Sequence, residues 1–468
     1  MIKTLNSIFD LMKMLYISKK IENNPKKSRR DIEKTANRKI RDIVKFAYYN
    51  SEFYRELYDR AGIDINNFKL KDLPIINKKM LMENFDRVLT VKDIDINQIK
   101  KIIEKQEENL KVCKDKYYLL ATAGTSGYNG WFVWDRDYMV TTTAFAKART
   151  PVKINYLKMI LKGYKSVGLF TCNPMHLSTR SFSMGVIHFF KMRIVPIHQD
   201  INTIVADLNK FKPDFLTGFP SIIFNLAKIK QKNKLRIKPE NIVTGGEFLS
   251  KKVREYIEDV FRTKVYDVYG CTEAHPISNM CKEQEHHINE DFCLVEIVDK
   301  KLKSVQENKV GCYILLTNFY SKTFPIIRYM IDDRILIKKK KCKCGSNMKV
   351  IDIKDGRTST MFVFKNKRAE KILIHPFVFS TMLELMHDIV QKQIIQETED
   401  WLIVNVIKKE RSSKIKIKNK IIEGFEKIFE KHNIDPRKIQ LDILFVDKVY
   451  RDKKTGKVQE EISKIYKI

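Results

Sequence analysis

Two short polar segments, separated by about one helix, carry the side chains best suited to chemistry. The first is the glycine turn Gly245-Gly246-Glu247, and the second is Tyr269-Gly270-Cys271-Thr272-Glu273. Between them, apolar residues in 250–261 recur at helical spacing, which predicts a strand–helix–strand unit. Such units build parallel sheets whose ligands bind at the carboxyl ends of the strands, so both segments should border one nucleotide-sized site. Either segment alone would fit equally well a glycine turn that merely ends a strand.

A second candidate site is a loop of small hydroxyl residues and glycines between two apolar strands at 117–120 and 131–134. Its sequence is Thr122-Ala123-Gly124-Thr125-Ser126-Gly127-Tyr128-Asn129-Gly130. Backbone N–H and hydroxyl groups in such a loop can surround an anion, and a polyphosphate would suit them. The alternative is an ordinary hairpin turn.

Two further segments place a charged side chain after a strand. Residues 325–333 end in Asp333, and an ionised carboxylate can accept hydrogen bonds from two neighbouring hydroxyls. The alternative is a solvated turn. Residues 452–458, near the C-terminus, hold Lys457 beside Gly456, and a flexible loop can carry a lysine ammonium into a closed site as a mobile point charge.

Four metal-binding candidates stand out from the other cysteines and histidines. Cys342 and Cys344 form a tight pair, and Cys281 with His287 forms a second. Three thiolates and one imidazole make a closed tetrahedral set that suits structural zinc and leaves no position for a substrate. His286 is an alternative ligand, and reduced thiols without a metal are the alternative to the whole site.

Together these motifs resemble the adenylate-forming superfamily, in particular the branch of phenylacetate–coenzyme A ligases and similar capsular polysaccharide biosynthesis proteins. The resemblance extends from about residue 48 to residue 457 and includes Gly356-Arg357, which is similar to the hinge before the family's small domain. It implies that Tyr269 stacks on adenine, that Thr272 contacts phosphate and that Glu273 binds magnesium. Tyr128 departs from the family pattern, in which many members carry Lys.

The resemblance assigns a role to each candidate residue. The implied catalytic residues are Lys457, Glu273 and Thr272. The implied ATP- or AMP-binding residues are Thr122, Gly124, Thr125, Ser126, Gly127, Gly245, Gly246, Glu247, Tyr269, Gly270, Asp333 and Arg357. His176 and Phe219 are candidates for an acyl pocket.

The implied reaction has two halves. A carboxylate would attack the α-phosphate of ATP with Mg²⁺ and Lys457 offsetting the charge, and the acyl-adenylate would then pass its acyl group to coenzyme A. One alternative is adenylation followed by transfer to an amine or hydroxyl in capsular or surface polysaccharide biosynthesis. The other is a non-catalytic, zinc-bearing basic binding protein. The sequence does not identify the acid.

The expected fold is α/β, with a large N-terminal domain of βαβ-type sheets over residues 1–356 and a small mobile α+β lid over 357–468. A helical cap occupies residues 1–65, and its segment 29–60 is predicted as one long amphipathic helix. The predicted lid has strands at 392–396, 402–406 and 441–446 and a helix at 421–432.

Composition sets broad limits on partners. The chain has 468 residues, 43% hydrophobic residues and a formal charge of +32, enough for a large core and more than one folding unit. Its lysines are spread from Lys3 to Lys467, and the clearest basic runs, 338–341 and 408–420, contain no aromatic residues on which bases could stack, so we expect no specific nucleic-acid partner. No apolar run reaches the ~20 residues of a membrane span, and the expected location is cytoplasmic.

The N-terminal segment combines apolar residues at helical spacing with flanking lysines. This pattern predicts a helix that packs on its own domain, with peripheral contact to a membrane surface as the alternative. The sequence gives no prediction of oligomeric state.

Overall fold

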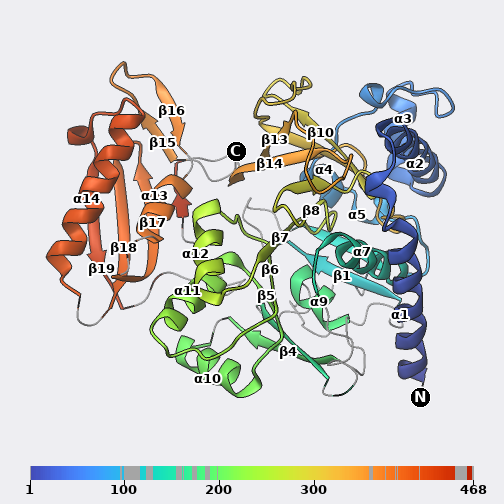
Figure 1. Cartoon of the computed structure of the whole chain (residues 1–468). Helices are drawn as coiled ribbons and strands as arrows, with labels where there is room; N and C mark the ends of the chain where they lie inside the picture. Colours follow the sequence, from blue (N-terminus) through green and yellow to red (C-terminus); the bar gives the residue numbers. More distant parts are fainter. Residues whose placement is uncertain are drawn as a thin grey trace. The chain divides into compact units, whose positions relative to one another are not determined.

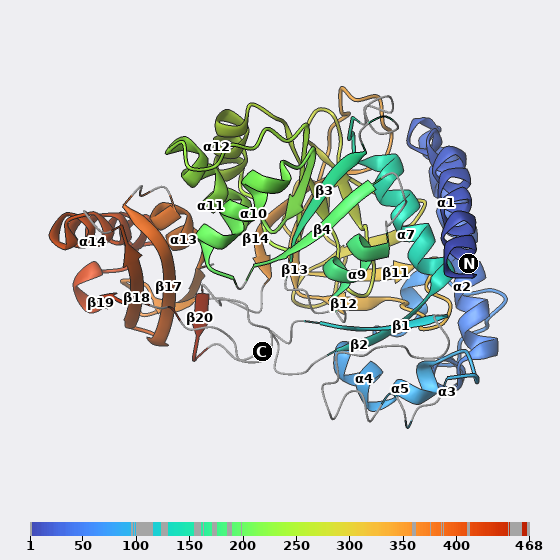
Figure 2. The same ribbon diagram turned by 90° about the horizontal axis from the view of Figure 1, so that it is seen from below.

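The structure is a computed structural model, and Figures 1 and 2 show it in two views. It describes residues 2–94, 97, 99, 116–122, 130–153, 161, 163–170, 176–184, 190–197, 199–357, 362–374, 376–384, 386, 388–409, 412–447, 449 and 461–465. The chain divides into two compact units. The first comprises Met1–Ile331 with Ile335–Ile353, and the second comprises Asp332–Arg334 with Lys354–Ile468.

The first unit is built on a sheet with strand order β13-β14-β9-β8-β7-β6-β5-β3-β4. The strands of this sheet are β3 (Tyr164–Phe170), β4 (Phe190–Pro196), β5 (Phe215–Gly218), β6 (Asn241–Gly245), β7 (Val265–Tyr269), β8 (Ser278–Met280), β9 (His286–Ile288), β13 (Asp333–Lys338) and β14 (Val350–Arg357). Strands β4, β3, β5, β6 and β7 are parallel, whereas β8 and β9 continue the sheet as an antiparallel hairpin. The predicted α/β class is therefore confirmed.

Helices cover both faces of the parallel strands (Figures 1 and 2). One face carries α10 (Ile201–Phe211), α11 (Pro220–Gln231) and α12 (Lys251–Phe261), and the other carries α7 (Arg136–Arg149) and α9 (Leu177–Met184). The α12 side chains at helical spacing, Val253, Ile257 and Phe261, are buried against the sheet. Removing such apolar area from water stabilises the layer by about 25 cal/mol per Å². The predicted strand–helix–strand unit β6–α12–β7 is confirmed.

Two smaller antiparallel sheets complete this unit. One is the antiparallel pair of β1 (Tyr117–Ala121) and β2 (Trp131–Asp135), the two strands predicted on either side of the glycine- and hydroxyl-rich loop. The other has the order β10-β11-β12, formed by β10 (Cys293–Val298), β11 (Tyr313–Asn318) and β12 (Tyr329–Ile331). Phe132 from the hairpin and Tyr329 from β12 meet edge to face, which joins the two sheets in one core.

The N-terminal region is helical, but the prediction of one helix over 29–60 is wrong. The elements are α1 (Ile2–Ile21), η1 (Asn24–Lys26), α2 (Arg29–Asn50), α3 (Glu52–Arg60), η2 (Leu70–Asp72), α4 (Lys78–Glu83) and α5 (Phe85–Val88). Ser51 is buried and extended, donates to the Arg87 carbonyl and accepts from the Tyr54 amide. Its side chain thereby ends α2 and caps α3, a local competition that apolar periodicity does not reveal.

A buried charged cluster ties these helices to the turn between β9 and β10. Arg149 of α7 pairs with Asp291 at 2.7 Å, with both side chains almost fully buried. Lys39 of α2 donates to the Asp291 carbonyl at 2.6 Å and to the Tyr320 hydroxyl. Burial lowers the pKa of Lys39 to about 8.

The second unit is α+β, as predicted. It contains β15 (Phe362–Lys365), β16 (Lys371–Ile374), α13 (Phe377–Glu384), β17 (Ile389–Thr398), β18 (Trp401–Lys408), α14 (Lys414–Lys431), η3 (Pro436–Lys438), β19 (Gln440–Phe445) and β20 (Glu461–Ser463). Its main sheet has the order β19-β18-β17-β20, and α14 packs on it through Phe425 and Phe429. Helix α14 begins seven residues before the predicted Ile421, because Ser413 caps it at Lys414.

Candidate functional site

The glycine turn that follows β6 requires glycine at two positions for different reasons. Gly246 has a φ of +78°, and a Cβ there would lie 2.9 Å from the Phe219 ring. A Cβ on Gly245 would lie 2.9 Å from the Val268 carbonyl of β7. Side chains rarely adopt such a φ, and neither contact leaves room for one. The turn thus keeps its backbone close to both β7 and Phe219.

The third residue of the turn, Glu247, is tied to the next element. Its carboxylate accepts a hydrogen bond of 3.1 Å from the Ser221 amide in the first turn of α11. An acidic group at a helix N-terminus is favourable, so Glu247 has a structural role in addition to its predicted role beside adenine. Phe219, predicted to line an acyl pocket, is buried against Gly246 and meets Phe170 edge to face.

The second polar segment forms a tight loop at the carboxyl end of β7. The Cys271 amide donates to the Ala274 carbonyl, and the Ala274 amide returns a bond to Cys271. Gly270 packs closely against the His275 imidazole. A Cβ at this position would lie only 2.8 Å from the ring, so the contact requires glycine. Desolvation lowers the pKa of His275 to about 4, so this ring is neutral at physiological pH. The half-buried Tyr269 lies at the end of β7, where it pairs with Ser278 of β8.

Glu273 lies buried in this loop and is held by residues from two other strands. The Tyr329 hydroxyl of β12 donates to Glu273 Oε1 at 2.7 Å, and Asn318 Nδ2 of β11 donates to the Glu273 carbonyl at 3.0 Å. Trp134 of β2 donates its indole N–H to the Thr272 carbonyl at 3.0 Å. Strands from both smaller sheets therefore fix the backbone of Thr272 and Glu273 and orient the Glu273 carboxylate.

A chain of buried polar side chains lies among the strands that carry these loops. Thr244 of β6 donates to Asp267 of β7 at 2.6 Å, and His286 Nε2 lies 3.3 Å from Asp267. His286 Nδ1 in turn contacts the Ser278 hydroxyl at 3.0 Å. Although the order resembles a Ser-His-Asp triad, Ser278 is fully buried, so no substrate reaches it. This series of polar side chains links four neighbouring strands, β6, β7, β8 and β9.

The base of the predicted phosphate loop is closed by Thr122. Its amide donates to the Gly130 carbonyl at 2.8 Å, and its Oγ1 accepts from the Gly130 amide at 2.9 Å. These two bonds hold the ends of the loop together across the β1–β2 hairpin. Gly124, Thr125, Ser126 and Gly127 lie outside the described residues, as does Lys457.

The remaining predicted residues have separate positions. Asp333 is buried at the start of β13 and groups with the second unit. Arg357 is the last residue of β14. His176 is half-buried just before α9, and its carbonyl accepts from the Arg180 amide.

The glycine turn and the Thr272–Glu273 loop lie at the carboxyl ends of neighbouring parallel strands, with the hairpin joined to them through Trp134. A family model described as AMP-binding enzyme matches residues 78–314, which include all three elements. This chain belongs to the AMP-binding enzyme family. The superfamily resemblance seen in the sequence is confirmed.

Two curated proteins are similar to this AMP-binding enzyme over most of its length. Protein CapK of Staphylococcus aureus is 24% identical over 392 residues, covering 81% of this chain and 78% of CapK. The phenylacetate-coenzyme A ligase of Thermus thermophilus is 25% identical over 345 residues, covering 70% of each protein.

A solved structure shares the fold. The crystal structure of 2-hydroxyisobutyryl-CoA ligase in the postadenylation state, in complex with R3-HIB-AMP, superposes with a TM-score of 0.70 at 16% identity. The match covers 94% of this chain and 91% of that one, so the architecture extends over both units.

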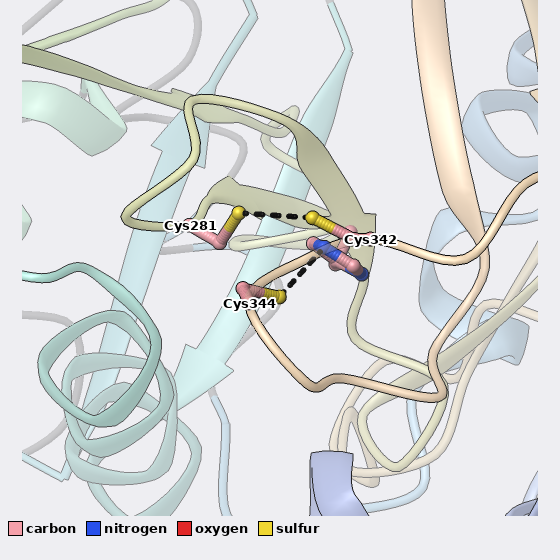
Figure 3. Close-up of side chains that lie close together, drawn as sticks. Cys281, Cys342 and Cys344 are labelled. Atoms are coloured by element: carbon pink, nitrogen blue, oxygen red, sulfur yellow. Dashed lines mark hydrogen bonds between the residues drawn. The ribbon is translucent and has the colours of Figure 1, made fainter.

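The AMP-binding enzyme also contains a compact cysteine–histidine cluster in its first unit. The ligand atoms of Cys281, His287, Cys342 and Cys344 all lie within 4.8 Å of one another. Cys281 Sγ lies 3.7 Å from Cys342 Sγ, and Cys344 Sγ lies 3.4 Å from His287 Nε2 (Figure 3). The structure thus brings together the four residues that the sequence nominated.

Strand pairing explains how residues about sixty positions apart meet. Cys281 follows β8 and His287 lies in β9, whereas Cys342 and Cys344 lie in the loop between β13 and β14. Pairing of Val350 in β14 with His287 places that loop over the β8–β9 hairpin. The alternative ligand His286 is directed instead to Asp267 and Ser278.

The chemistry of the cluster fits a soft divalent cation. His287 Nδ1 lies 3.0 Å from the Met348 carbonyl, and donation there leaves the Nε2 lone pair for a metal. Burial raises the pKa of the Cys281 thiol to about 12, also raises that of Cys344, and lowers the pKa of His287. Thiolates at such a site need a cation to offset their charge.

Proposed function

We propose that this protein is an AMP-forming ligase that activates a carboxylic acid with ATP and transfers the acyl group to coenzyme A. The observation that carries the proposal is the buried Glu273, oriented by Tyr329 at the carboxyl end of β7 and beside the glycine turn of β6. Family membership and similarity to a phenylacetate-coenzyme A ligase support the same chemistry.

Glu273 is suited to hold Mg²⁺. Its carboxylate is an acceptor-only group, and the hydrogen bond that it accepts within the described part of the chain, from Tyr329, goes to Oε1, so Oε2 is available for a hard cation. Bound there, Mg²⁺ would neutralise charge that develops on the ATP phosphates. The protein supplies a fixed carboxylate, held from the backbone by Asn318 and from the side chain by Tyr329.

The nucleotide is proposed to lie along the two turns. The turn of Gly245, Gly246 and Glu247 lines the adenine pocket, Tyr269 stacks on the base and Thr272 contacts phosphate. Thr122 closes the loop that includes Gly124, Thr125, Ser126 and Gly127, and the loop's amides and hydroxyls would receive the polyphosphate. Asp333 is proposed to accept from the ribose hydroxyls.

The two half-reactions are proposed to use different positions of the C-terminal region. In adenylation Lys457 would approach the α-phosphate, where a mobile ammonium stabilises the developing negative charge. Rotation about Arg357 would then withdraw Lys457 and admit the coenzyme A thiol. The predicted lid over 357–468 is part of this proposal.

We further propose that Cys281, His287, Cys342 and Cys344 bind structural zinc. Four protein ligands close a tetrahedral site, so such a metal would join two loops and take no part in ligation. Among the described residues, every helix is too short or too polar to cross a bilayer. A cytoplasmic location is our proposal.

The direct test is the product formed from ATP, Mg²⁺ and a panel of aryl, fatty and hydroxy acids, with and without coenzyme A. We expect pyrophosphate release with one acid class, and a coenzyme A thioester when the thiol is present. Lys457→Ala should abolish adenylation, whereas Lys454→Ala should not. Adenylation that continues to an amine or hydroxyl product but never to a thioester would favour the polysaccharide alternative. No ATP binding would favour a non-catalytic protein.

A further inference from the structure

The N-terminal helix α1 is apolar on both of its long faces, but only one face is packed. Its inner face lies on α7, where Ser18 is buried and donates to the Ala144 carbonyl at 3.1 Å. The same contact carries a partly buried ion pair of Arg136 with Asp10 at 2.6 Å and a solvent-exposed pair of Lys13 with Asp137 at 2.7 Å. Figures 1 and 2 both show α1 running beside α7. The predicted packing of this helix on its own domain is therefore observed.

The outer face of α1 carries a contiguous row of exposed apolar side chains, here called the α1 stripe. The stripe consists of Ile8, Phe9, Met12, Leu15 and Tyr16. Each of these side chains is between 45% and 66% exposed. Their spacing of one, three or four residues places all five on one side of the helix. A contiguous row of exposed apolar side chains of this kind indicates an interaction surface.

Three lysines flank the α1 stripe. Lys19 and Lys20 stand at its C-terminal end, with Lys20 over the ring of Tyr16 at 5.9 Å from the centroid. Lys13 borders the stripe on its flank. Lys13 and Lys19 have acidic partners, Asp137 and Glu22, but both pairs are solvent-exposed, so their lysines can turn toward another anion at little cost.

We propose that the α1 stripe docks the protein on an anionic lipid surface. Phe9, Met12 and Leu15 would enter the boundary between headgroups and acyl chains, and Tyr16 would sit at headgroup level. Lys19 and Lys20 would extend along the apolar surface and place their ammonium groups beside lipid phosphates. The helix would lie in the plane of the membrane while α7 holds its other face.

Charge and size favour a lipid surface over a second copy of this chain. Each copy has a formal charge of +32, so two lysine-flanked stripes would repel each other, whereas an anionic bilayer attracts them. A stable protein–protein interface also needs about 800 Å² per partner, more than five partly exposed side chains on one helix can bury. A bilayer requires no complementary protein surface.

The test is co-sedimentation of the full-length protein with vesicles of phosphatidylcholine alone or with about one third phosphatidylglycerol. We expect binding to the anionic vesicles that weakens as salt screens the lysines. The double variant Phe9→Glu/Met12→Glu should partition ~10-fold less, whereas Phe9→Leu/Met12→Leu should bind like the wild type. The control is Ile415→Glu, an apolar-to-acidic change at an exposed position on α14, which should leave binding unchanged, and the single variant Phe9→Glu, which adds the same charge, should weaken it.

Three results would overturn the inference. Equal binding by the Phe9→Glu/Met12→Glu variant would mean that general positive charge, rather than the stripe, contacts lipid. Equal binding to neutral and anionic vesicles would show that the protein does not recognise an anionic lipid surface. Absence of vesicle binding, together with a wild-type dimer that the variant converts to monomer in sedimentation, would assign the stripe to a second copy. Circular dichroism of each variant verifies the fold, and none of these readouts depends on ligase activity.

Discussion

The Tyr329 hydroxyl donates a hydrogen bond of 2.7 Å to Glu273 Oε1, and both side chains are buried. Tyr329 lies on β12 and Glu273 in the loop after β7, so the bond joins the three-stranded sheet to the main sheet. A carboxylate held in this way has one oxygen directed to the protein, which fixes where the other oxygen points. Tyr329 is therefore a positioning residue for the proposed magnesium ligand.

Replacing Tyr329 with Phe should raise the Mg²⁺ concentration needed for half-maximal adenylation. A hydrogen bond to a charged group contributes about 1.5–3 kcal/mol, so we expect a shift of roughly 10- to 100-fold. An ATP–pyrophosphate exchange assay titrated with Mg²⁺ measures it. Tyr313→Phe on β11 is the control and should not shift the titration. A lowered rate with an unchanged Mg²⁺ dependence would mean that Tyr329 only supports the fold.

Gly246→Ala should destabilise the protein and weaken ATP binding together. Its φ of +78° costs an alanine about 1–2 kcal/mol, and the new Cβ would also press on the Phe219 ring. Gly62→Ala separates the two effects, because Gly62 has a φ of +64° but no atom within 4 Å of the added Cβ. Chemical denaturation and equilibrium ATP binding should show a larger loss for Gly246→Ala. Equal losses in both variants would argue against the close contact.

Cys342→Ser should remove stoichiometric zinc and lower the thermal midpoint of unfolding. Loss of a ligand opens the tetrahedral set that joins the β8–β9 hairpin to the β13–β14 loop, and we expect a fall of roughly 5–10 °C. Elemental analysis and thermal unfolding measure these effects, with Cys312→Ser as the control outside the cluster. Adenylation below the transition should persist. A structural zinc site would be contradicted if the wild-type protein contained no zinc after purification and added zinc left its thermal midpoint of unfolding unchanged.

Lys39 should make stability rise with pH in the alkaline range. Burial lowers its folded pKa to about 8 from 10.5, so between these values the unfolded chain binds the extra proton. The penalty for burying the charged ammonium is complete below pH 8 and disappears as pH rises toward 10.5, a change of at most about 3 kcal/mol.

Urea denaturation of the wild type and Lys39→Met between pH 7 and 10.5 isolates this contribution, because other titrating groups are common to both. The difference in unfolding free energy, wild type minus variant, should increase toward high pH. A difference that is constant over this range would show that Lys39 titrates normally.

The sequence predicted most of the architecture because its signals were local. The β6–α12–β7 unit followed from helical spacing between two glycine-containing turns, and the α+β C-terminal unit followed from alternating strands. The break at Ser51 was missed because it depends on a hydrogen bond to Arg87, 36 residues away, which apolar periodicity cannot show. The predicted start of α14 was too late, because the lysines in its first two turns interrupt the apolar periodicity.

The supporting residues of the candidate site were beyond the sequence. Trp134, Asn318 and Tyr329 act through contacts across 45 to 138 positions in the chain, and nothing local marks them. Tyr329 lies within the segment 325–333, but the sequence indicated a role only for Asp333. The cysteine–histidine cluster was predictable because cysteines are few, and the sequence already favoured His287; the strand register is what sets aside the alternative, His286.

The most direct test of the account is ATP–pyrophosphate exchange by the wild type and Glu273→Gln with the preferred acid, alongside equilibrium binding of ATP. Gln keeps the size and the contact with Tyr329 but removes the charge that would hold Mg²⁺. We expect exchange to fall at least ~100-fold while ATP still binds. Undiminished exchange by Glu273→Gln would contradict an adenylation site at the end of β7.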